Sequence, residues 1–204
     1  PKPFITCSLL RLLSHGQCIV KDDSGKVLQV TISALMRLLM RLLTDYFRKY
    51  PFAADIKKEI DALSLNSISK RNDLVDFSLG PVYLRTDLWF GVPSGGSVGH
   101  IAGVLNNLDN FTGKPIFLTT DFIPTVRKDL EAYCIHPEFK FWDFTELPSL
   151  LFNKKCTRDA ANVLQKRAIS FIYQRYSLNN YTGVKLAKTF HVPLVLEYNG
   201  SEIW

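Results

Sequence analysis

The chain has 204 residues, 47% of them hydrophobic and 12% aromatic, and its formal net charge is +6. This length and composition can bury one large or two small cores, which excludes a disordered protein, and the absence of a long apolar run or a secretory leader predicts a cytoplasmic location. The positive charge suits an anionic partner, but no nucleic-acid-binding motif and no metal-ligand spacing is present, so we expect neither a nucleic-acid partner nor a metal.

The first fifty residues predict a β-hairpin followed by an amphipathic helix. Residues 17–30 alternate in polarity and turn at residues 23–25, as a hairpin requires. From Thr31, a suitable N-cap, apolar residues recur at helical spacing as far as Tyr50, and Pro51 is expected to end the helix. A basic amphipathic helix of this kind can pack on its own domain, or it can make peripheral contact with the inner face of the cytoplasmic membrane. We expect packing, with a buried stripe made of Leu35, Leu39, Leu43 and Phe47.

The remaining chain predicts a linker and then an α/β domain. Residues 51–76 contain one short helix and a polar stretch, so we divide the chain into a hairpin and helical segment, 1–75, and a second domain, 76–204. After residue 76, apolar strands alternate with helices, which indicates βαβ units and a parallel sheet with helices on both faces. We therefore predict a Rossmann-like domain whose ligand lies beyond the carboxyl ends of the strands. Strands are expected at 80–90, 114–122, 139–144, 169–176 and 193–199, with helices at 98–111, 125–134, 157–168 and 179–191.

The stretch "SGGSVGHIAGVLNNL", residues 94–108, places a glycine pair at the start of a predicted helix. A dinucleotide-binding site would require G-x-G-x-x-G directly after the strand, with an acidic residue about 20 positions later. Asp121 follows the glycines at the required sequence distance, but the glycines stand at positions 95, 96 and 99, which is not the G-x-G-x-x-G spacing. An NAD(P)-dependent oxidoreductase therefore remains only an alternative. A longer Gly-Gly loop instead lets main-chain N–H groups face a phosphate or a sugar hydroxyl.

The glycine stretch is followed later by "FIYQRYSLNNYTGVKLAKTFHVPLVLEYNGS". In this order the two motifs resemble the N-terminal, acceptor-side domain of bacterial nucleotide-sugar glycosyltransferases of the GT-B architecture, glycosyltransferase family 4 in particular. The resemblance covers about residues 80–201. It implies that the chain is a truncated part of an enzyme whose second, C-terminal Rossmann-like domain holds most of the donor.

The resemblance also implies a function and a site. The full enzyme would transfer a sugar from a nucleotide-sugar donor, without a separate cofactor, to a growing bacterial surface glycan such as O-antigen or capsule, carried as a glycan or lipid-linked glycan acceptor. Catalytic roles would fall to His100, Arg175 and Tyr173, although the family often has a histidine in the turn that here offers the latter two. Substrate-binding roles would fall to Ser94, Gly95, Gly96, Ser97, Glu197 and Asn199. A non-catalytic glycan- or nucleotide-binding module is a further alternative.

Overall fold

The computed structural model describes residues 2–21, 27–65 and 74–198, and the chain divides into two compact units. The first unit comprises Pro1–Leu65 together with Phe139–Pro148, and the second comprises Asn66–Glu138 and Ser149–Trp204. Most of the polar stretch expected as a linker, residues 66–73, lies outside the described residues. The segment at 139–148 therefore groups with the N-terminal elements, although it comes from the middle of the second half of the sequence.

The first unit consists of a hairpin and two helices. The predicted hairpin is confirmed, because its strands pair antiparallel with Ile19 opposite Gln29, while its turn at residues 23–25 lies outside the described residues. The expected N-cap is confirmed as well, since Thr31 Oγ1 accepts the Ala34 N–H at 3.1 Å. The elements are α1 (Pro3–Leu13), β1 (Ile19–Lys21), β2 (Val27–Gln29) and α2 (Ile32–Leu65).

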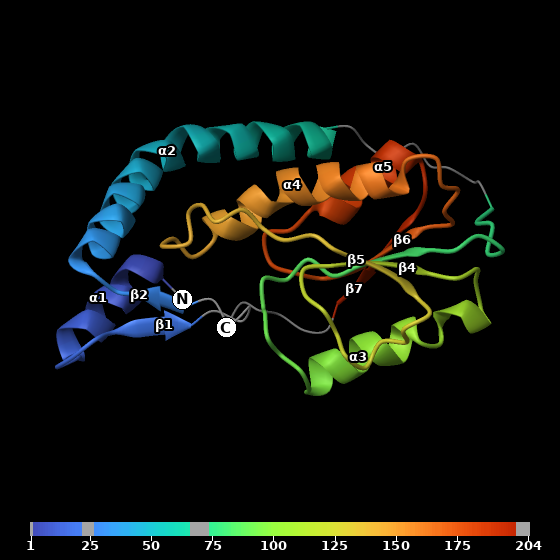
Figure 1. Ribbon diagram of the computed structural model, residues 1–204. Helices are drawn as coiled ribbons and strands as arrows, with labels where there is room; N and C mark the ends of the chain where they lie inside the picture. Colours follow the sequence, from blue (N-terminus) through green and yellow to red (C-terminus); the bar gives the residue numbers. More distant parts are fainter. Residues whose placement is uncertain (1, 22–26, 66–73, 199–204) are drawn as a thin grey trace. The chain divides into compact units, whose positions relative to one another are not determined.

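Helix α2 differs from the sequence prediction in its length. It does not end at Pro51 but continues to Leu65, with the proline inside. A proline removes one backbone donor and crowds the preceding turn, which bends a helix without necessarily ending it. Figure 1 shows α2 as a bent helix.

The predicted burial of the α2 stripe is wrong for half of its residues. Leu35 and Leu39 are half-buried, and the first of these packs against Cys7, Cys18 and Val30. Leu43 and Phe47 are exposed instead. The helix therefore packs along one edge of its apolar surface and leaves the rest uncovered.

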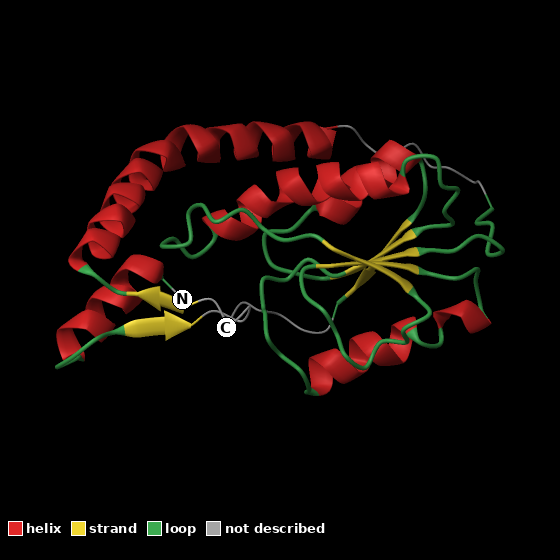
Figure 2. Cartoon of the chain, viewed as in Figure 1, coloured by secondary structure: helices red, strands yellow, loops and turns green. Residues whose placement is uncertain are grey.

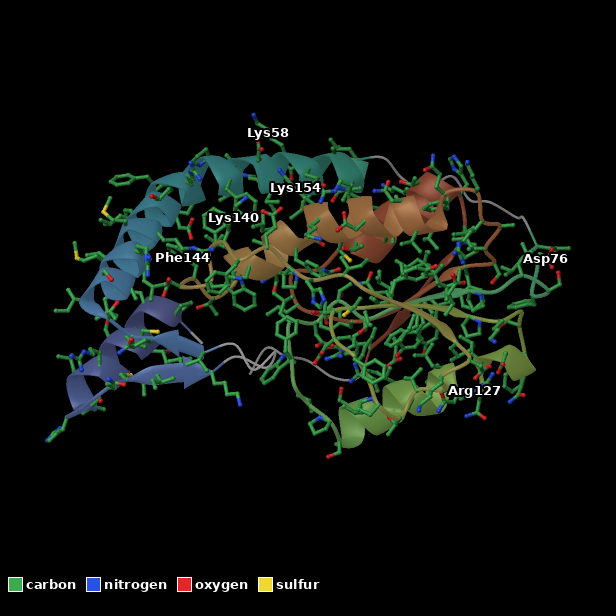
Figure 3. All side chains as sticks on the ribbon, in the orientation of Figure 1. Lys58, Asp76, Arg127, Lys140, Phe144 and Lys154 are labelled. Atoms are coloured by element: carbon green, nitrogen blue, oxygen red, sulfur yellow. The ribbon has the colours of Figure 1, made fainter. Side chains whose placement is uncertain are left out.

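The strand predicted at 139–144 is also wrong. Its alternating aromatic residues form bends and turns that pack on α2 within the first unit. The Phe141 ring stacks on Phe52 with centroids 5.0 Å apart, and the Phe141 N–H donates to the buried carboxylate of Asp45 at 2.8 Å. In Figure 3 the labelled Phe144 belongs to this segment, and its ring lies 5.7 Å from Lys49 Nζ. Phe141 is thus buried against a helix rather than within a sheet.

The second unit is a Rossmann-like domain with a five-stranded, all-parallel sheet, as predicted. The strand order is β5-β4-β3-β6-β7, so the chain starts at the central strand, builds one half outward and then crosses over to build the other half. Figure 2 shows these strands with helices on both sides. The strands are β3 (Val82–Leu84), β4 (Ile116–Thr119), β5 (Glu131–Cys134), β6 (Ile172–Arg175) and β7 (Leu194–Glu197).

Side-chain alternation along the strands divides the core into two layers. Val82 and Leu84 of β3 face helices α4 and α5, in a cluster that includes Phe152, Cys156 and Leu186. Tyr83 and Phe117 face the opposite layer, where they pack against α3. Figure 1 shows α3 on one side of the sheet and α4 and α5 on the other. The helices are α3 (Gly96–Leu105), the short 3₁₀ helix η1 (Leu108–Asn110), α4 (Leu147–Leu164) and α5 (Thr182–Phe190).

The helix predicted at 125–134 is wrong, because this segment contains β5. Val126, Leu130 and Tyr133 have helical spacing, but β5 pairs in parallel with β4 and places Phe117 opposite Ala132. The preceding loop is fixed by Arg127, labelled in Figure 3, whose guanidinium binds the carboxylates of Asp109 and Asp129 at 2.7 and 2.9 Å. The first of these ion pairs joins the loop before β5 to Asp109 of the short 3₁₀ helix η1, Leu108–Asn110.

Candidate functional site

The predicted ligand-binding edge of the sheet is present. Strands β3, β6 and β7 run parallel, so their carboxyl ends lie at one edge. Because β4 lies on one side of β3 and β6 on the other, this edge contains the point where the strand order reverses. Open α/β sheets bind ligands at that point. The sequence predicts that the glycine loop and the ends of β6 and β7 lie at one edge of the sheet. A direct contact confirms this, because Nε2 of His100, in α3, lies 3.1 Å from Oε1 of Glu197, at the end of β7.

Glu197, the last residue of β7, is the centre of a polar cluster. Its side chain is only 7% exposed, and its Oε1 also accepts a bond from Arg175 Nη1 at 3.1 Å. Its other oxygen accepts the hydroxyl of Tyr83 at 3.1 Å, and the ring of Tyr173 stacks on Tyr83 at a centroid distance of 5.1 Å. We call these five residues, Tyr83, His100, Tyr173, Arg175 and Glu197, the Glu197 cluster.

The two tyrosines of the cluster keep their hydroxyl protons over the physiological pH range, so they act as hydrogen-bond donors. Burial raises the pKa of the Tyr83 hydroxyl far above its ordinary value, and the nearby Glu197 carboxylate raises it further. Burial likewise raises the pKa of Tyr173 to about 12, with a further contribution from Glu197, to which it is hydrogen-bonded. The cluster therefore surrounds the buried side chain of Glu197 with hydrogen-bond donors.

His100 is the exposed member of the cluster. Its side chain is 47% exposed, and it extends from α3 to the carboxylate of Glu197. A neutral imidazole that donates through Nε2 has an acceptor lone pair at Nδ1. The carboxylate therefore fixes the ring orientation and leaves Nδ1 as the group that can take a proton from a ligand.

The glycine pair shapes the start of α3 at the same edge. Gly95 is the N-cap with φ of +136°, a conformation that favours glycine, and a Cβ at Gly96 would meet nothing within 4 Å. Both glycines are exposed, as are Ser94 and Ser97. The first helical bond runs from the Gly99 N–H to the Gly95 carbonyl, and the N-cap, being a glycine, has no side chain to cap the amides before it. These amides form the positive end of the helix.

Helix α5 begins beyond β6 but has a different N-terminus. Asn153 Oδ1 accepts the Tyr181 N–H at 2.8 Å, Gln174 Oε1 accepts the Gly183 N–H at 2.7 Å, and Asn180 Oδ1 accepts the Thr182 N–H at 3.1 Å. Amide side chains, of which Asn153 and Gln174 are buried, therefore satisfy the first turn of α5 from within the domain. Of the two helix starts, that of α3 has its amides available to a ligand.

Asp121, the acidic residue considered for ribose binding, has internal partners. Its two carboxylate oxygens accept the N–H groups of Gly91 and Phe122, at 2.7 and 2.8 Å. Eleven residues, 85–95, separate β3 from α3, whereas a dinucleotide site needs a tight turn there. Asp121 thus shapes the loop after β3, and the geometry disfavours the dinucleotide-binding alternative.

Sequence reasoning placed four members of the cluster in the site but missed Tyr83 and the neighbouring Arg85. Tyr83 is a polar residue in the otherwise apolar run "PVYL", which is the only signal that could have singled it out. Arg85 is buried directly after β3, and its guanidinium binds the Asp87 carboxylate at 2.8 Å and the Trp89 carbonyl at 2.7 Å. Asn199, the remaining predicted site residue, lies outside the described residues.

Comparison with known proteins adds little to this site. No family model matches the chain, and no curated protein matches it. Among solved structures, two crystal structures of the C-terminal domain of a hydrogenase from Pyrococcus furiosus are similar over 65% of this chain and 100% of theirs, at 8% and 9% identity and TM-scores of 0.39 and 0.36. At these values the similarity carries no argument about function. No helix among the described residues is long and apolar enough to cross a membrane.

Proposed function

We propose that the second unit is the acceptor-side domain of a GT-B glycosyltransferase that transfers a sugar from a nucleotide-sugar donor to a bacterial surface glycan. The observation that carries the proposal is the bond between His100 and Glu197, beside the exposed N-terminus of α3. The site thus combines a proton acceptor, His100, with a helix N-terminus that can bind an anion. Transfer of a sugar from a nucleotide diphosphate needs these two groups. The resemblance of both glycine and strand motifs to glycosyltransferase family 4 supports the same function.

The reaction assigns a separate role to each part of the site. The acceptor hydroxyl forms a bond to the anomeric carbon of the donor sugar, and the bond from that carbon to the diphosphate oxygen breaks with its electron pair. His100 Nδ1 takes the proton of the acceptor hydroxyl, and Glu197 stabilises the imidazolium that forms. Arg175 and Tyr83 in turn hold the Glu197 carboxylate in place. His100 is then the catalytic residue, while Arg175 and Tyr173 are positioning residues.

The glycine loop supplies charge stabilisation. The amides at the start of α3, from Gly96 onward, carry partial positive charge that faces the developing diphosphate anion. Ser94 and Ser97 flank these amides with exposed hydroxyls that can bond sugar hydroxyls. Most of the donor would be held by a second Rossmann-like domain, as the resemblance implies, at the cytoplasmic side where nucleotide sugars are found.

Binding of an acceptor glycan to this chain tests the proposal. The probes are bacterial surface oligosaccharides and NAD, each titrated into isotopically labelled protein while the amide signals of Gly95 to Ser97 are followed by NMR. We expect an oligosaccharide to shift these amides, and we expect His100→Gln and Glu197→Gln to weaken that binding roughly tenfold. His136→Gln is the matched control, since this exposed histidine follows β5 at the same sheet edge.

Two results would overturn the proposal. One is binding of NAD at micromolar concentration with shifts in the same amides, which would favour the oxidoreductase. The other is oligosaccharide binding that His136→Gln reduces as much as His100→Gln does. In the complete enzyme, His100→Gln should lower kcat by about 10² to 10⁴-fold with a smaller effect on KM, because a general base acts in the transition state.

A further inference from the structure

The first unit exposes a continuous apolar stripe along the first half of α2. The stripe consists of Ile32, Met36, Met40, Leu43, Phe47 and Tyr50, all of them exposed, with Met40 at 58% and Phe47 at 73%. At 100° per residue, these six positions fall within an arc of about 80° on the helix. Helix α1 of the same unit adds the exposed side chains of Leu9, Leu12 and Leu13. An uncovered apolar surface of this extent marks an interaction site.

The charges beside the stripe all have one sign. Arg37 and Arg48 are exposed on one side of it, and Lys49 lies on the other, with its Nζ 3.8 Å from the Tyr46 ring centroid. Asp45 is the acidic residue between Ile32 and Tyr50, and its carboxylate is buried and accepts the Phe141 N–H. The surface presented by this half of α2 is therefore apolar in the middle and cationic at both edges.

The positive charge of the whole chain is concentrated in the same region. Residues 1–50 contain eight lysines and arginines but only three acidic residues, whereas the rest of the chain contains 17 basic and 16 acidic residues. Residues 1–50 thus carry most of the net charge of +6. This excess of positive charge lies in the part of the chain that includes the first half of α2 and its exposed stripe, where it favours attraction to an anionic surface.

We infer that the first unit docks on an anionic lipid bilayer, with the α2 stripe in the boundary between headgroups and acyl chains. A helix with an apolar stripe and basic edges binds bilayers in this way, lying in the interface rather than crossing it. A second copy of the chain fits the stripe less well, because pairing the two stripes would bring Arg37 and Arg48 of both copies together. A fluid bilayer also accepts the exposed leucines of α1 without a complementary shape.

Vesicle sedimentation tests this docking with the whole chain. The probes are vesicles of phosphatidylcholine alone and vesicles in which about one-third of the lipid is phosphatidylglycerol. We expect strong preference for the anionic vesicles. Arg37→Gln/Arg48→Gln should weaken binding about thirtyfold at low salt, since each basic residue near the surface contributes about a factor of five. This difference should shrink as salt is raised.

A second variant tests the apolar stripe itself. Met40→Ser/Phe47→Ser retains every charge, and we expect it to lower binding roughly tenfold or more at any salt concentration. Phe111→Ser is the matched control, because Phe111 is 78% exposed in the second unit, and it should bind like the wild type. Since all substituted residues are exposed, melting temperatures should be unchanged.

Three results would overturn the docking inference. The first is equal binding to neutral and anionic vesicles, and the second is unchanged binding of Met40→Ser/Phe47→Ser. The third is concentration-dependent self-association that this variant abolishes while vesicle binding is absent, which would assign the stripe to a second copy. None of these results bears on glycan binding at the Glu197 cluster, so the two proposals fail separately.

Discussion

The substitution Glu197→Gln tests whether the Glu197 cluster depends on a buried charge. Glutamine retains the shape and an oxygen that can still accept from the buried Tyr83 hydroxyl. It removes the negative charge that faces Arg175, whose side chain is largely buried. Losing a charged hydrogen bond and leaving its cation poorly solvated costs about 2–3 kcal/mol. We therefore expect the free energy of unfolding of the second unit to fall by that amount.

Glu131→Gln is a control with the same chemistry at lower burial. Glu131 of β5 is bound by Arg167 through two bonds of 2.6 and 2.7 Å and by the Tyr133 hydroxyl. This carboxylate is exposed, so water can replace its partners. The two variants thus compare the same arginine–tyrosine–carboxylate arrangement on the two outer strands of the sheet, β5 and β7, where it differs in burial.

Urea unfolding, followed through the amide signals of β3 and β6, measures both losses in the second unit. We expect an unchanged denaturant dependence and a clearly larger loss for Glu197→Gln than for Glu131→Gln. Adding Arg175→Met to Glu197→Gln should recover part of the stability, because the unpaired cation is removed. Equal losses for the two single variants, or no recovery in the double variant, would refute the reasoning from burial.

Three further outcomes are expected. Gly95→Ala should cost about 1–2 kcal/mol by thermal denaturation because of its positive φ, while Gly96→Ala, which meets open space, should be near neutral; equal effects would contradict the backbone argument. Bonds from Arg167 and from Tyr133 lower the pKa of Glu131 to about 2, from an ordinary value of 4.5, so the stability it adds is complete above pH 4.5 and is lost as the pH falls towards 2. NMR titration of that carboxyl group should show the low midpoint, and Arg167→Gln should raise it. Calorimetric titration should show no NAD or NADP binding, and micromolar affinity would refute our interpretation of the loop after β3.

The fold of the second unit could be predicted where strands were apolar and helices regular. The runs around Val82, Ile116 and Ile172 were recognised as strands because buried parallel strands are apolar on both faces. Two segments were misassigned because the spacing of their apolar residues fits more than one kind of secondary structure. Val126, Leu130 and Tyr133 repeat as in a helix, and residues 139–144 alternate as in a strand, but long-range contacts decided both.

The candidate site was partly predictable for a topological reason. Parallel strands bring their carboxyl ends to one edge, so Arg175 and Glu197 could be placed near the glycine loop from the sequence alone. The bond from His100 to Glu197 depends on the side of α3 that faces the sheet, and the role of Tyr83 depends on the register between β3 and its neighbours. Neither can be derived from local sequence, since both are fixed by packing between distant elements.

The uneven cover of the sheet explains why the Glu197 cluster is accessible. Helices α4 and α5 pack on one layer, whereas α3 is the helix whose buried residues pack on the other. The β4–β5 connection adds loop residues such as Ile123 to that layer over β4. Val195 of β7 and Tyr198, the residue that follows this strand, remain exposed. A ligand can thus approach His100 from the β7 side without displacing a described helix, while the carboxylate behind it stays shielded from water, which strengthens its hold on the imidazole.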